Sequence, residues 1–329
     1  MKVGIIGAGA WGTGLAHVIA RGGTSVVLWS FEGEYEHFDG IGLSSAVVVT
    51  TDMANLEDCD VWIAVTPAAF FRDTMTKAKE FYKNQPIIVC TKGAEPKTGK
   101  FMTEILKETI NPNRQNIGVL SGPQFAGEVA HDVPTGSTLA GSSKIHEIGK
   151  TVFNQLYLSY TDDVIGTVVC GVGKNAVALI SGYVKIKGKG ENESALAMTE
   201  LWQEVVYLGM KLGAKMETFL DFCGLGDLLL TATSKTSRNF SAGMALALNE
   251  PLTGTVEGIS ALDGLVKHAT QAHVHVPILS KMQGKLSRDR MITHENKKLK
   301  DVKFMLGISS FSFAMQKKKK LKKYFDFAK

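Results

Sequence analysis

Residues 3–12, VGIIGAGAWG, decide the fold of this chain, because an apolar run leads directly into glycines spaced as GxGxxG. The run predicts a short buried strand, and residues 13–20, TGLAHVIA, predict the helix that follows it. In such a unit the first glycine allows the tight turn, the second lets the backbone approach a pyrophosphate, and the third lets the helix pack close to the strand. Free N–H groups at the helix N-terminus then face the anion. We therefore expect a dinucleotide at Gly7, Gly9, Ala10, Trp11 and Gly12.

Further apolar runs rich in β-branched residues follow in the first half of the chain, with helical stretches between them. They are residues 25–30, 47–50, 61–65, 86–90 and 117–120. This alternation predicts a mainly parallel sheet covered by helices on both faces. Ligands bind at the carboxyl edge of such sheets. Polar residues and glycine follow the later runs, as in Thr66-Pro67, Thr91-Lys92-Gly93 and Ser121-Gly122-Pro123.

The sequence pattern changes near residue 166, after which helical patterns rich in alanine and leucine dominate. We predict an α/β fold with a Rossmann-type dinucleotide-binding domain at 1–165, an all-α C-terminal substrate domain at 166–290, and a basic tail of uncertain structure at 291–329. No apolar stretch is expected to be long enough to span a bilayer. The predicted helices of the second domain are residues 168–184, 194–212, 227–233, 239–248 and 258–268.

The net charge of +5 is distributed unevenly along the chain. Residues 297–329 contain eleven lysines and two acids, a charge of +9, so the rest of the chain carries −4. A mildly acidic body without a basic stripe argues against nucleic acid as a partner. The tail also contains aromatic residues, and a weak contact with an anionic membrane surface is one interpretation of it. The favoured interpretation is a solvated tail whose apolar residues dock on the helical domain.

Cysteine and histidine usage points to a cytoplasmic protein without a metal. The four cysteines are widely spaced and form no CxxC pair, which is typical of reduced, buried thiols. The first strand begins at once, so we expect no signal peptide. His273 and His275 alternate with valines, as in a short extended segment, and no further clustered ligand accompanies them.

Lys174 lies within residues 168–177, VVCGVGKNAV, an apolar and glycine-rich run near the expected domain junction. Desolvation lowers the pKa of a lysine, which makes it a better proton donor and acceptor near neutral pH. The alternative is a lysine whose ammonium group reaches water from an apolar helix. The residues alone leave both interpretations open.

Two further segments carry residues suited to a polar substrate. Asp227 follows Gly-Leu-Gly and precedes an apolar run, so a helix N-cap is the favoured interpretation. The alternative is a hydrogen-bond partner for a substrate hydroxyl or a lysine, with Thr231 one turn further on the same face. Residues 236–239, TSRN, open another helix. Ser237 is suited to cap it, and Arg238 adds a planar fork that matches phosphate oxygens.

Together these segments resemble the bacterial-type NAD(P)-dependent sn-glycerol-3-phosphate dehydrogenase family, from residue 1 to about residue 290. Several motifs in the right order carry the resemblance. They are the glycine turn with Trp11-Gly12-Thr13, Thr91-Lys92-Gly93, Ser121-Gly122-Pro123 with Phe125-Ala126, residues 162–166, Gly173-Lys174-Asn175, residues 224–228, Thr231, Ser237-Arg238-Asn239 and Val256-Glu257-Gly258.

The resemblance implies reduction of dihydroxyacetone phosphate to sn-glycerol 3-phosphate, which supplies glycerophospholipid synthesis, in an enzyme that is commonly a homodimer. It implies that Lys174 is the catalytic acid/base, that Lys92 is a second substrate-contacting lysine, and that Asp227 fixes the substrate and Lys174. The implied substrate contacts are Lys92, Gly122, Gln124, Asp227, Thr231, Ser237, Arg238 and Asn239. The implied cofactor contacts beyond the glycine turn are Ser30, Lys92, Ala126, Arg238 and Glu257.

The chain departs from the family pattern at four places. Gln124 stands where the family usually has Ser or Thr, and residues 66–69, TPAA, replace a Pro-Ser-Gln-like turn. Residues 171–173, GVG, replace a Gly-Ala-Leu-like run, and the extra glycine should loosen that helix by about 1 kcal/mol. The segment 31–47, where the adenosine would rest, is shorter than usual. These changes leave every charged catalytic group in place.

The cofactor is NAD or NADP, and two residues after the second strand favour NAD. Glu32 has about the spacing expected of an acid that binds the ribose, and Ser30 stands where family members often carry a basic residue for the 2′-phosphate. Two other functions remain as alternatives. A dehydrogenase of a hydroxy acid or a ketopantoate-like substrate would not need the Ser-Arg-Asn phosphate handle. A divergent, non-catalytic dinucleotide-binding protein would not be expected to retain Lys92, Lys174 and Asp227.

Overall fold

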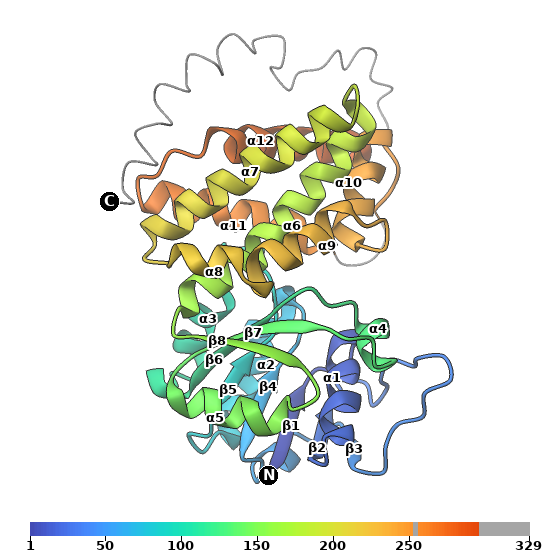
Figure 1. Ribbon diagram of the computed structural model, residues 1–329, viewed down its shortest axis with the longest axis vertical. Coiled ribbons are helices and arrows are strands. Elements are labelled where there is room, and N and C mark those ends of the chain that lie inside the picture. Colours follow the sequence, from blue (N-terminus) through green and yellow to red (C-terminus); the bar gives the residue numbers. More distant parts are fainter. Residues whose placement is uncertain (253–255, 296–329) are drawn as a thin grey trace. The chain divides into compact units, whose positions relative to one another are not determined.

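The first half of the chain forms an eight-stranded sheet with the order β3-β2-β1-β4-β5-β6-β7-β8 (Figure 1). The computed structural model describes residues 1–252 and 256–295. All neighbouring strands are parallel except β6 and β7, which confirms the mainly parallel sheet. The strands are β1 (Lys2–Ile6), β2 (Ser25–Trp29), β3 (Val47–Thr50), β4 (Val61–Ala64), β5 (Ile87–Val89), β6 (Ile117–Ser121), β7 (Gly136–Ala140) and β8 (Tyr157–Thr161).

Strands β7 and β8 were not predicted, because neither is an apolar run. Both contain hydroxyl-bearing residues, and Ser137 and Thr138 of β7 are nevertheless fully buried. Their polar atoms are hydrogen-bonded in place: Ser159 of β8 donates to Thr138 at 3.1 Å, and the Thr138 hydroxyl also accepts the N–H of Cys223 at 3.1 Å. The buried hydroxyl groups therefore join these strands to each other and to the helical part of the chain.

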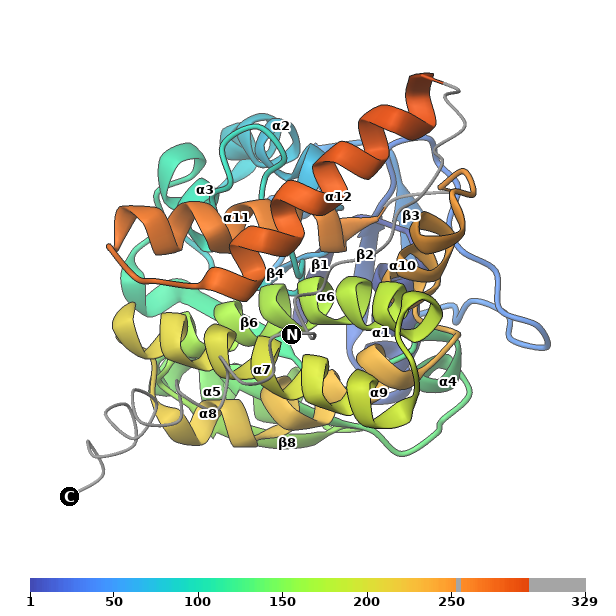
Figure 2. The same ribbon diagram turned by 90° about the horizontal axis from the view of Figure 1, so that it is seen from above.

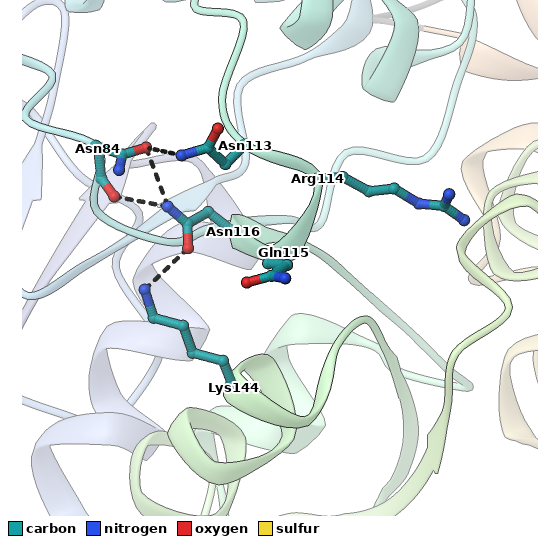
Figure 3. A pocket seen from close by; sticks show the side chains of 6 residues that line it. All are labelled: Asn84, Asn113, Arg114, Gln115, Asn116 and Lys144. Atoms are coloured by element: carbon teal, nitrogen blue, oxygen red, sulfur yellow. Dashed lines mark hydrogen bonds between the residues drawn. The ribbon is translucent and has the colours of Figure 1, made fainter.

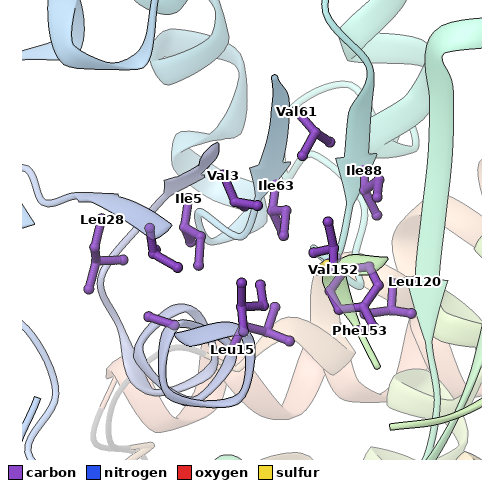
Figure 4. Close-up of a cluster of buried hydrophobic side chains, with 14 of the residues drawn as sticks. Val3, Ile5, Leu15, Leu28, Val61, Ile63, Ile88, Leu120, Val152 and Phe153 are labelled. Atoms are coloured by element: carbon purple, nitrogen blue, oxygen red, sulfur yellow. The ribbon is translucent and has the colours of Figure 1, made fainter. Parts of the chain in front are cut away.

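Helices cover both faces of the sheet. Figure 4 shows Ile5 of β1 and Ile63 of β4 packed against Leu15 of α1 (Ala10–Arg21) and Phe153 at the end of α5 (Ser143–Val152). Helices α2 (Ala68–Ala78) and α3 (Met102–Thr109) lie on the opposite face (Figure 2). From the adjacent strands β1 and β4 the chain winds outward in opposite directions. Their carboxyl ends therefore flank the crevice where sheets of this kind bind ligands.

The second half of the described chain is entirely helical, as predicted. Its central helix is α6 (Val164–Lys187), which is buried along most of its length. The extra glycine of this helix has a packing role: a Cβ at Gly173 would lie only 2.4 Å from Cγ1 of Val205 in α7. The surrounding elements are α7 (Glu191–Lys211), α8 (Met216–Leu220), the short π-helix η4 (Phe222–Gly226), α9 (Asp227–Thr233), α10 (Arg238–Leu248), α11 (Glu257–Gln271) and α12 (Pro277–Glu295).

Two sequence-based expectations about the second half are wrong. No apolar stretch was expected to be long enough to span a bilayer, but within the described residues α6 is long and apolar enough to do so by length and composition. Its most apolar 18-residue stretch has a mean hydropathy of 1.7, and 89% of that stretch is buried inside the protein. It is the core helix of its domain. His273 does not lie in an extended segment, because it adopts a left-handed φ of 54° in the turn after α11. The basic tail expected at 291–329 lies outside the described residues from residue 296 onward.

Candidate active site

The glycine turn after β1 has the geometry that phosphate binding requires. Gly7 has a φ of +119°, which is strained for any residue with a side chain, and a Cβ at Gly12 would lie 1.8 Å from the Gly7 carbonyl oxygen. A Cβ at Gly9 would meet no atom within 4 Å, so space is open beside that backbone. Gly9 caps α1 without a side-chain hydrogen bond, and the first N–H groups of the helix remain available. The turn therefore fits the pyrophosphate of a dinucleotide.

The end of β2 differs from the arrangement expected from the sequence. Ser30 is 5% exposed, and its hydroxyl donates to the carbonyl oxygen of Glu34, so the side chain is already bonded within the protein. Phe31 is 74% exposed instead, and the Lys77 ammonium group lies 5.6 Å from the centre of its ring. The residue that presents a side chain at the carboxyl end of β2 is therefore Phe31.

Two lysines share one carboxylate where the helical domain meets the sheet edge. Nζ of Lys92, which follows β5, donates to Oδ2 of Asp227 at 2.7 Å and to the carbonyl oxygen of Gly122 at 2.8 Å. Nζ of Lys174 on α6 lies 3.1 Å from Oδ1 of Asp227 and donates to the Thr231 hydroxyl at 3.0 Å. The Thr231 hydroxyl in turn donates to Oδ1 of Asp227 at 3.0 Å. The structure thus brings together five predicted site residues from four separate segments.

The electrostatics of this centre favour a proton donor. Burial lowers the pKa of Lys174 below its ordinary value, although the neighbouring Asp227 charge acts in the opposite direction. Burial alone would raise the pKa of Asp227, but the charges of Lys174 and Lys92 lower it. The Lys92 and Lys174 side chains keep 16% and 11% exposure, whereas Asp227 keeps 2%. A substrate can therefore contact the ammonium groups while the carboxylate stays behind them.

Asp227 is not the helix cap that the sequence favoured. It is the first residue of α9, Gly226 occupies the cap position, and no side chain caps this helix. The π-helix η4 runs directly into α9 and makes a separate cap unnecessary. The Asp227 carboxylate is consequently free to bind the two lysines. The expectation that Thr231 shares its face is confirmed.

The start of α10 can bind an anion. The Ser237 side chain caps this helix by accepting the N–H of Phe240 at 3.3 Å, and Arg238 is exposed at the first helical position. The N–H groups of Arg238 and Asn239 have no partner within the helix. Asn239 at the second position donates to Asn175, the neighbour of Lys174, at 2.9 Å. The start of α10 therefore lies next to the segment of α6 that carries Lys174.

The loop after β6 supplies the remaining predicted substrate residues. The Gly122 carbonyl oxygen accepts from Lys92. Gln124 donates from Nε2 to the Ser137 hydroxyl at 2.5 Å, and its Oε1 atom is buried without a hydrogen-bond partner in the described part of the chain. The hydroxyl oxygens of Thr66 and Ser121 lie at the carboxyl ends of β4 and β6. Both are buried and have no hydrogen-bond partner within the described residues. Such orphaned polar atoms at the sheet edge fit a site that a ligand completes.

Two residues expected at the cofactor occupy contrasting positions. Ala126 opens the short helix α4 (Ala126–Ala130) and packs on α1, where a Cβ at Gly14 would lie 3.2 Å from its carbonyl oxygen. Glu257 is the first residue of α11. Burial raises the pKa of Glu257, while the charges of Lys174, Arg238 and Lys92 act to lower it. The Glu257 carboxylate therefore belongs to the same charged centre as the two lysines.

The sequence analysis assigns no role to Asn175, although it follows Lys174 in the motif Gly173-Lys174-Asn175. Asn175 is 98% buried, and its side-chain amide donates to the carbonyl oxygen of Lys92 at 2.8 Å. The sequence signal for this bridging role was an asparagine among the apolar residues of a core helix, because a buried amide needs hydrogen-bond partners.

A polar hollow lies far from this centre. It encloses about 540 Å³ and is lined by polar residues at the loops that enter β5 and β6, at the amino edge of the sheet (Figure 3). Asn116 binds Asn84 and Lys144 there, whereas Arg114 points away from the amide cluster. Nothing in it matches a predicted site residue. Among the described residues, no group of three or more His, Cys, Asp or Glu side chains could hold a metal ion.

The fold and the site define a two-domain dehydrogenase that uses a nicotinamide dinucleotide. Family models of the NAD-dependent glycerol-3-phosphate dehydrogenase N-terminus and C-terminus match residues 2–147 and 163–295. The chain belongs to this glycerol-3-phosphate dehydrogenase family. It is 38% identical over 299 residues to glycerol-3-phosphate dehydrogenase [NAD(P)+] of Caulobacter vibrioides, which covers 84% of this chain and 90% of the relative.

Solved structures agree with this assignment. Glycerol-3-phosphate dehydrogenase from Coxiella burnetii superposes with a TM-score of 0.80 at 28% identity, covering 90% of this chain and 98% of that one. A ketopantoate reductase from Ralstonia eutropha superposes with a TM-score of 0.62 at 16% identity, covering 89% of this chain and all of that one. The second likeness shows a shared fold only, so the ketopantoate-like alternative is not favoured.

Proposed function

We infer that this chain catalyses the NAD(P)H-dependent reduction of dihydroxyacetone phosphate to sn-glycerol 3-phosphate. The observation that carries the inference is the pair of lysines bound to Asp227 beside the exposed Arg238 at the start of α10. The direct test is loss of absorbance at 340 nm when the protein is mixed with reduced cofactor and dihydroxyacetone phosphate. A folded protein that leaves the absorbance unchanged would contradict the proposal.

In this mechanism the residues of the chain stabilise charge and move one proton. A reduced nicotinamide held along the glycine turn would supply the hydride for C2 of the substrate. Negative charge then develops on the ketone oxygen, and the ammonium group of Lys174 gives that oxygen its proton. Lys92 supplies positive potential, and Asp227 with Thr231 holds the Lys174 ammonium group in position. In the reverse direction the neutral Lys174 amine accepts the proton.

The phosphate of the substrate is a remote handle in this proposal. The Arg238 guanidinium and the free N–H groups at the start of α10 would bind its oxygens. Binding energy obtained there would hold the carbonyl group against Lys174 and the cofactor. The dinucleotide would lie along the glycine turn, with its nicotinamide end near Glu257.

Four further properties are proposals about this protein. We expect the protein in the cytoplasm. We also expect it to be a homodimer, and size-exclusion chromatography with light scattering would test this oligomeric state. We divide the chain into a Rossmann domain at 1–165, a helical domain at 166–290 and the basic tail 291–329. Weak binding of the tail to anionic lipid is tested by vesicle sedimentation at low salt, with a chain truncated after Glu295, the end of α12, as the comparison.

A further inference from the structure

We propose that the side chain of Asn239 is a positioning residue that fixes the main chain at Lys92 through Asn175, and that it does not bind the substrate phosphate. This inference rests on the proposed function. It assigns to Asn239 a different role from its neighbour Arg238, with which it shares the start of α10.

The observation that carries the inference is a continuous chain of hydrogen bonds through two amide side chains. The N–H of Gly258 in α11 donates to Oδ1 of Asn239 at 2.9 Å. Nδ2 of Asn239 donates to Oδ1 of Asn175 at 2.9 Å, and Nδ2 of Asn175 donates to the carbonyl oxygen of Lys92 at 2.8 Å. Each amide accepts from one neighbour and donates to the next. The chain therefore joins three helices of the helical domain to the edge of the sheet.

The hydrogen-bonding groups of Asn239 point inward and are already used. Asn239 is 92% buried, and both the oxygen and the nitrogen of its side-chain amide have protein partners at 2.9 Å. A phosphate at the start of α10 would meet the Asn239 main-chain N–H, which any residue provides, rather than the amide. Arg238 is exposed and free to turn its guanidinium toward the anion.

The packing around the chain of amides confirms that it is tightly constrained. A Cβ at Gly258 would lie 2.7 Å from the Asn175 carbonyl oxygen and 3.1 Å from Oδ1 of Asn239. Only glycine allows α11 to approach this closely, and the short distance is what brings the Gly258 N–H to Asn239. The weaker contact between Asn175 and Glu257, at 3.5 Å, lies at the same crossing.

The consequence for catalysis follows from where the chain of amides ends. The Lys92 carbonyl oxygen belongs to the residue whose ammonium group binds Asp227, so a shift of this main chain moves Lys92 relative to Lys174. Removing the Asn239 amide should therefore disturb the reacting groups and leave phosphate binding intact. The effect should fall on kcat, whereas loss of a phosphate ligand should weaken phosphate binding.

The experiment compares Asn239→Ala, Asn175→Ala and their double variant with Arg238→Lys, in steady-state reduction of dihydroxyacetone phosphate. Inorganic phosphate serves as the competitive probe of the anion site. We expect Asn239→Ala to lower kcat by about 10- to 100-fold, the range for a displaced catalytic group, with the phosphate inhibition constant unchanged within about twofold. Arg238→Lys should raise that constant. Leu248→Ala, an exposed position at the opposite end of the same helix, is the control that should leave both values unchanged.

Three outcomes would overturn the inference. They are an unchanged kcat in Asn239→Ala, a phosphate inhibition constant that rises as much as in Arg238→Lys, and a double variant whose loss is the product of the single losses. If Asn239→Ala does not fold, Asn239→Ser replaces it, because serine keeps a polar group at this buried position while its shorter side chain cannot reach Asn175. A wild-type chain without activity would refute the proposed function instead, so the two failures are distinguishable.

Discussion

Nζ of Lys92 lies 2.7 Å from Oδ2 of Asp227, although the two residues are 135 positions apart in the chain. One belongs to the loop after the fifth strand and the other begins a helix of the second domain. The other carboxylate oxygen, Oδ1, lies 3.1 Å from Nζ of Lys174. A single buried carboxylate thus sets the separation of the two ammonium groups, which can both face a developing oxyanion.

Removing the ammonium group of Lys174 should abolish most of the turnover. We expect Lys174→Ala to lower kcat by about 10²- to 10⁴-fold, the usual contribution of a positioned acid/base. Cofactor binding, measured by quenching of protein fluorescence with NADH, should change little, because the glycine turn is untouched. Wild-type-like turnover in a folded Lys174→Ala variant would exclude this residue as the proton donor.

The pH dependence of the reduction should report the pKa of Lys174. Lys174 must be protonated to act, so kcat for reduction should fall as pH rises through a pKa that burial lowers below the ordinary lysine value. The Asp227 charge raises this pKa. Asp227→Asn should therefore move the fall of kcat for reduction to lower pH. The rise of kcat for sn-glycerol 3-phosphate oxidation should also move to lower pH, because that direction needs the neutral amine. Profiles of kcat against pH test both statements, and a limb displaced to higher pH would contradict them.

Replacing the guanidinium of Arg238 should affect the phosphorylated substrate selectively. Arg238→Lys keeps the charge and loses the two-pronged geometry, so KM for dihydroxyacetone phosphate should rise more than KM for the cofactor. Dihydroxyacetone, which lacks the phosphate, should be a poor substrate of the wild type and respond little to the change. Equal loss with both substrates would show that Arg238 does not hold the phosphate.

Cofactor preference should respond at residue 31 rather than at residue 30. We expect NADH to be preferred to NADPH, and Phe31→Arg to raise the relative use of NADPH about tenfold, since a hydrogen bond to a charged group contributes about 1.5 kcal/mol. The ratio of kcat/KM values for the two cofactors measures this. Ser30→Arg should instead lower the thermal stability, because Ser30 is buried and bonded to Glu34. A wild type that prefers NADPH would refute this assignment.

His268 should give the protein a pH-dependent component of stability. Its ring stacks on Phe101 at 3.8 Å and bonds Glu104 at 2.9 Å, linking α11 to α3. Burial alone would lower the pKa of His268, but the bonds to Glu104 and to the Gly264 carbonyl oxygen raise it. The stabilisation is therefore complete below the unfolded-state pKa and is lost as pH rises through the folded-state pKa.

The variant His268→Phe keeps an aromatic ring on Phe101 and removes the hydrogen bonds, so it isolates this contribution. The free energy of unfolding should fall below that of the wild type at pH 6 by on the order of 1 kcal/mol, because Glu104 is partly exposed. At pH 8.5 the difference should be smaller. Urea unfolding at the two pH values measures it, and a difference that grows with pH would contradict the prediction.

Sequence periodicity predicted the sheet and most of the helices because each depends on local patterns. Apolar β-branched runs identified six strands, and alanine-rich repeats identified the helices of the second domain. Strands β7 and β8 were not predicted, because several of their buried residues carry hydroxyl groups. Hydrogen bonds to the neighbouring strand and to Cys223 satisfy these groups, and such partners cannot be seen in a local pattern. The assignment of Asp227 as a cap failed for a similar reason, because its partners lie on other elements.

By itself, the sequence determined that a dinucleotide turn follows the first strand, because the strand, the glycines and the helix are contiguous and their requirements are local. It also determined that Lys174 lies in an apolar helix, but left open whether its ammonium group reaches water or stays in the site. Only the tertiary structure decided this, by placing Asp227 and Thr231 against Lys174. It also turned Asn239 inward and exposed Phe31 in place of Ser30. Such choices depend on which side chains meet across distant segments, and that is fixed by packing and by the need to pair every buried polar group.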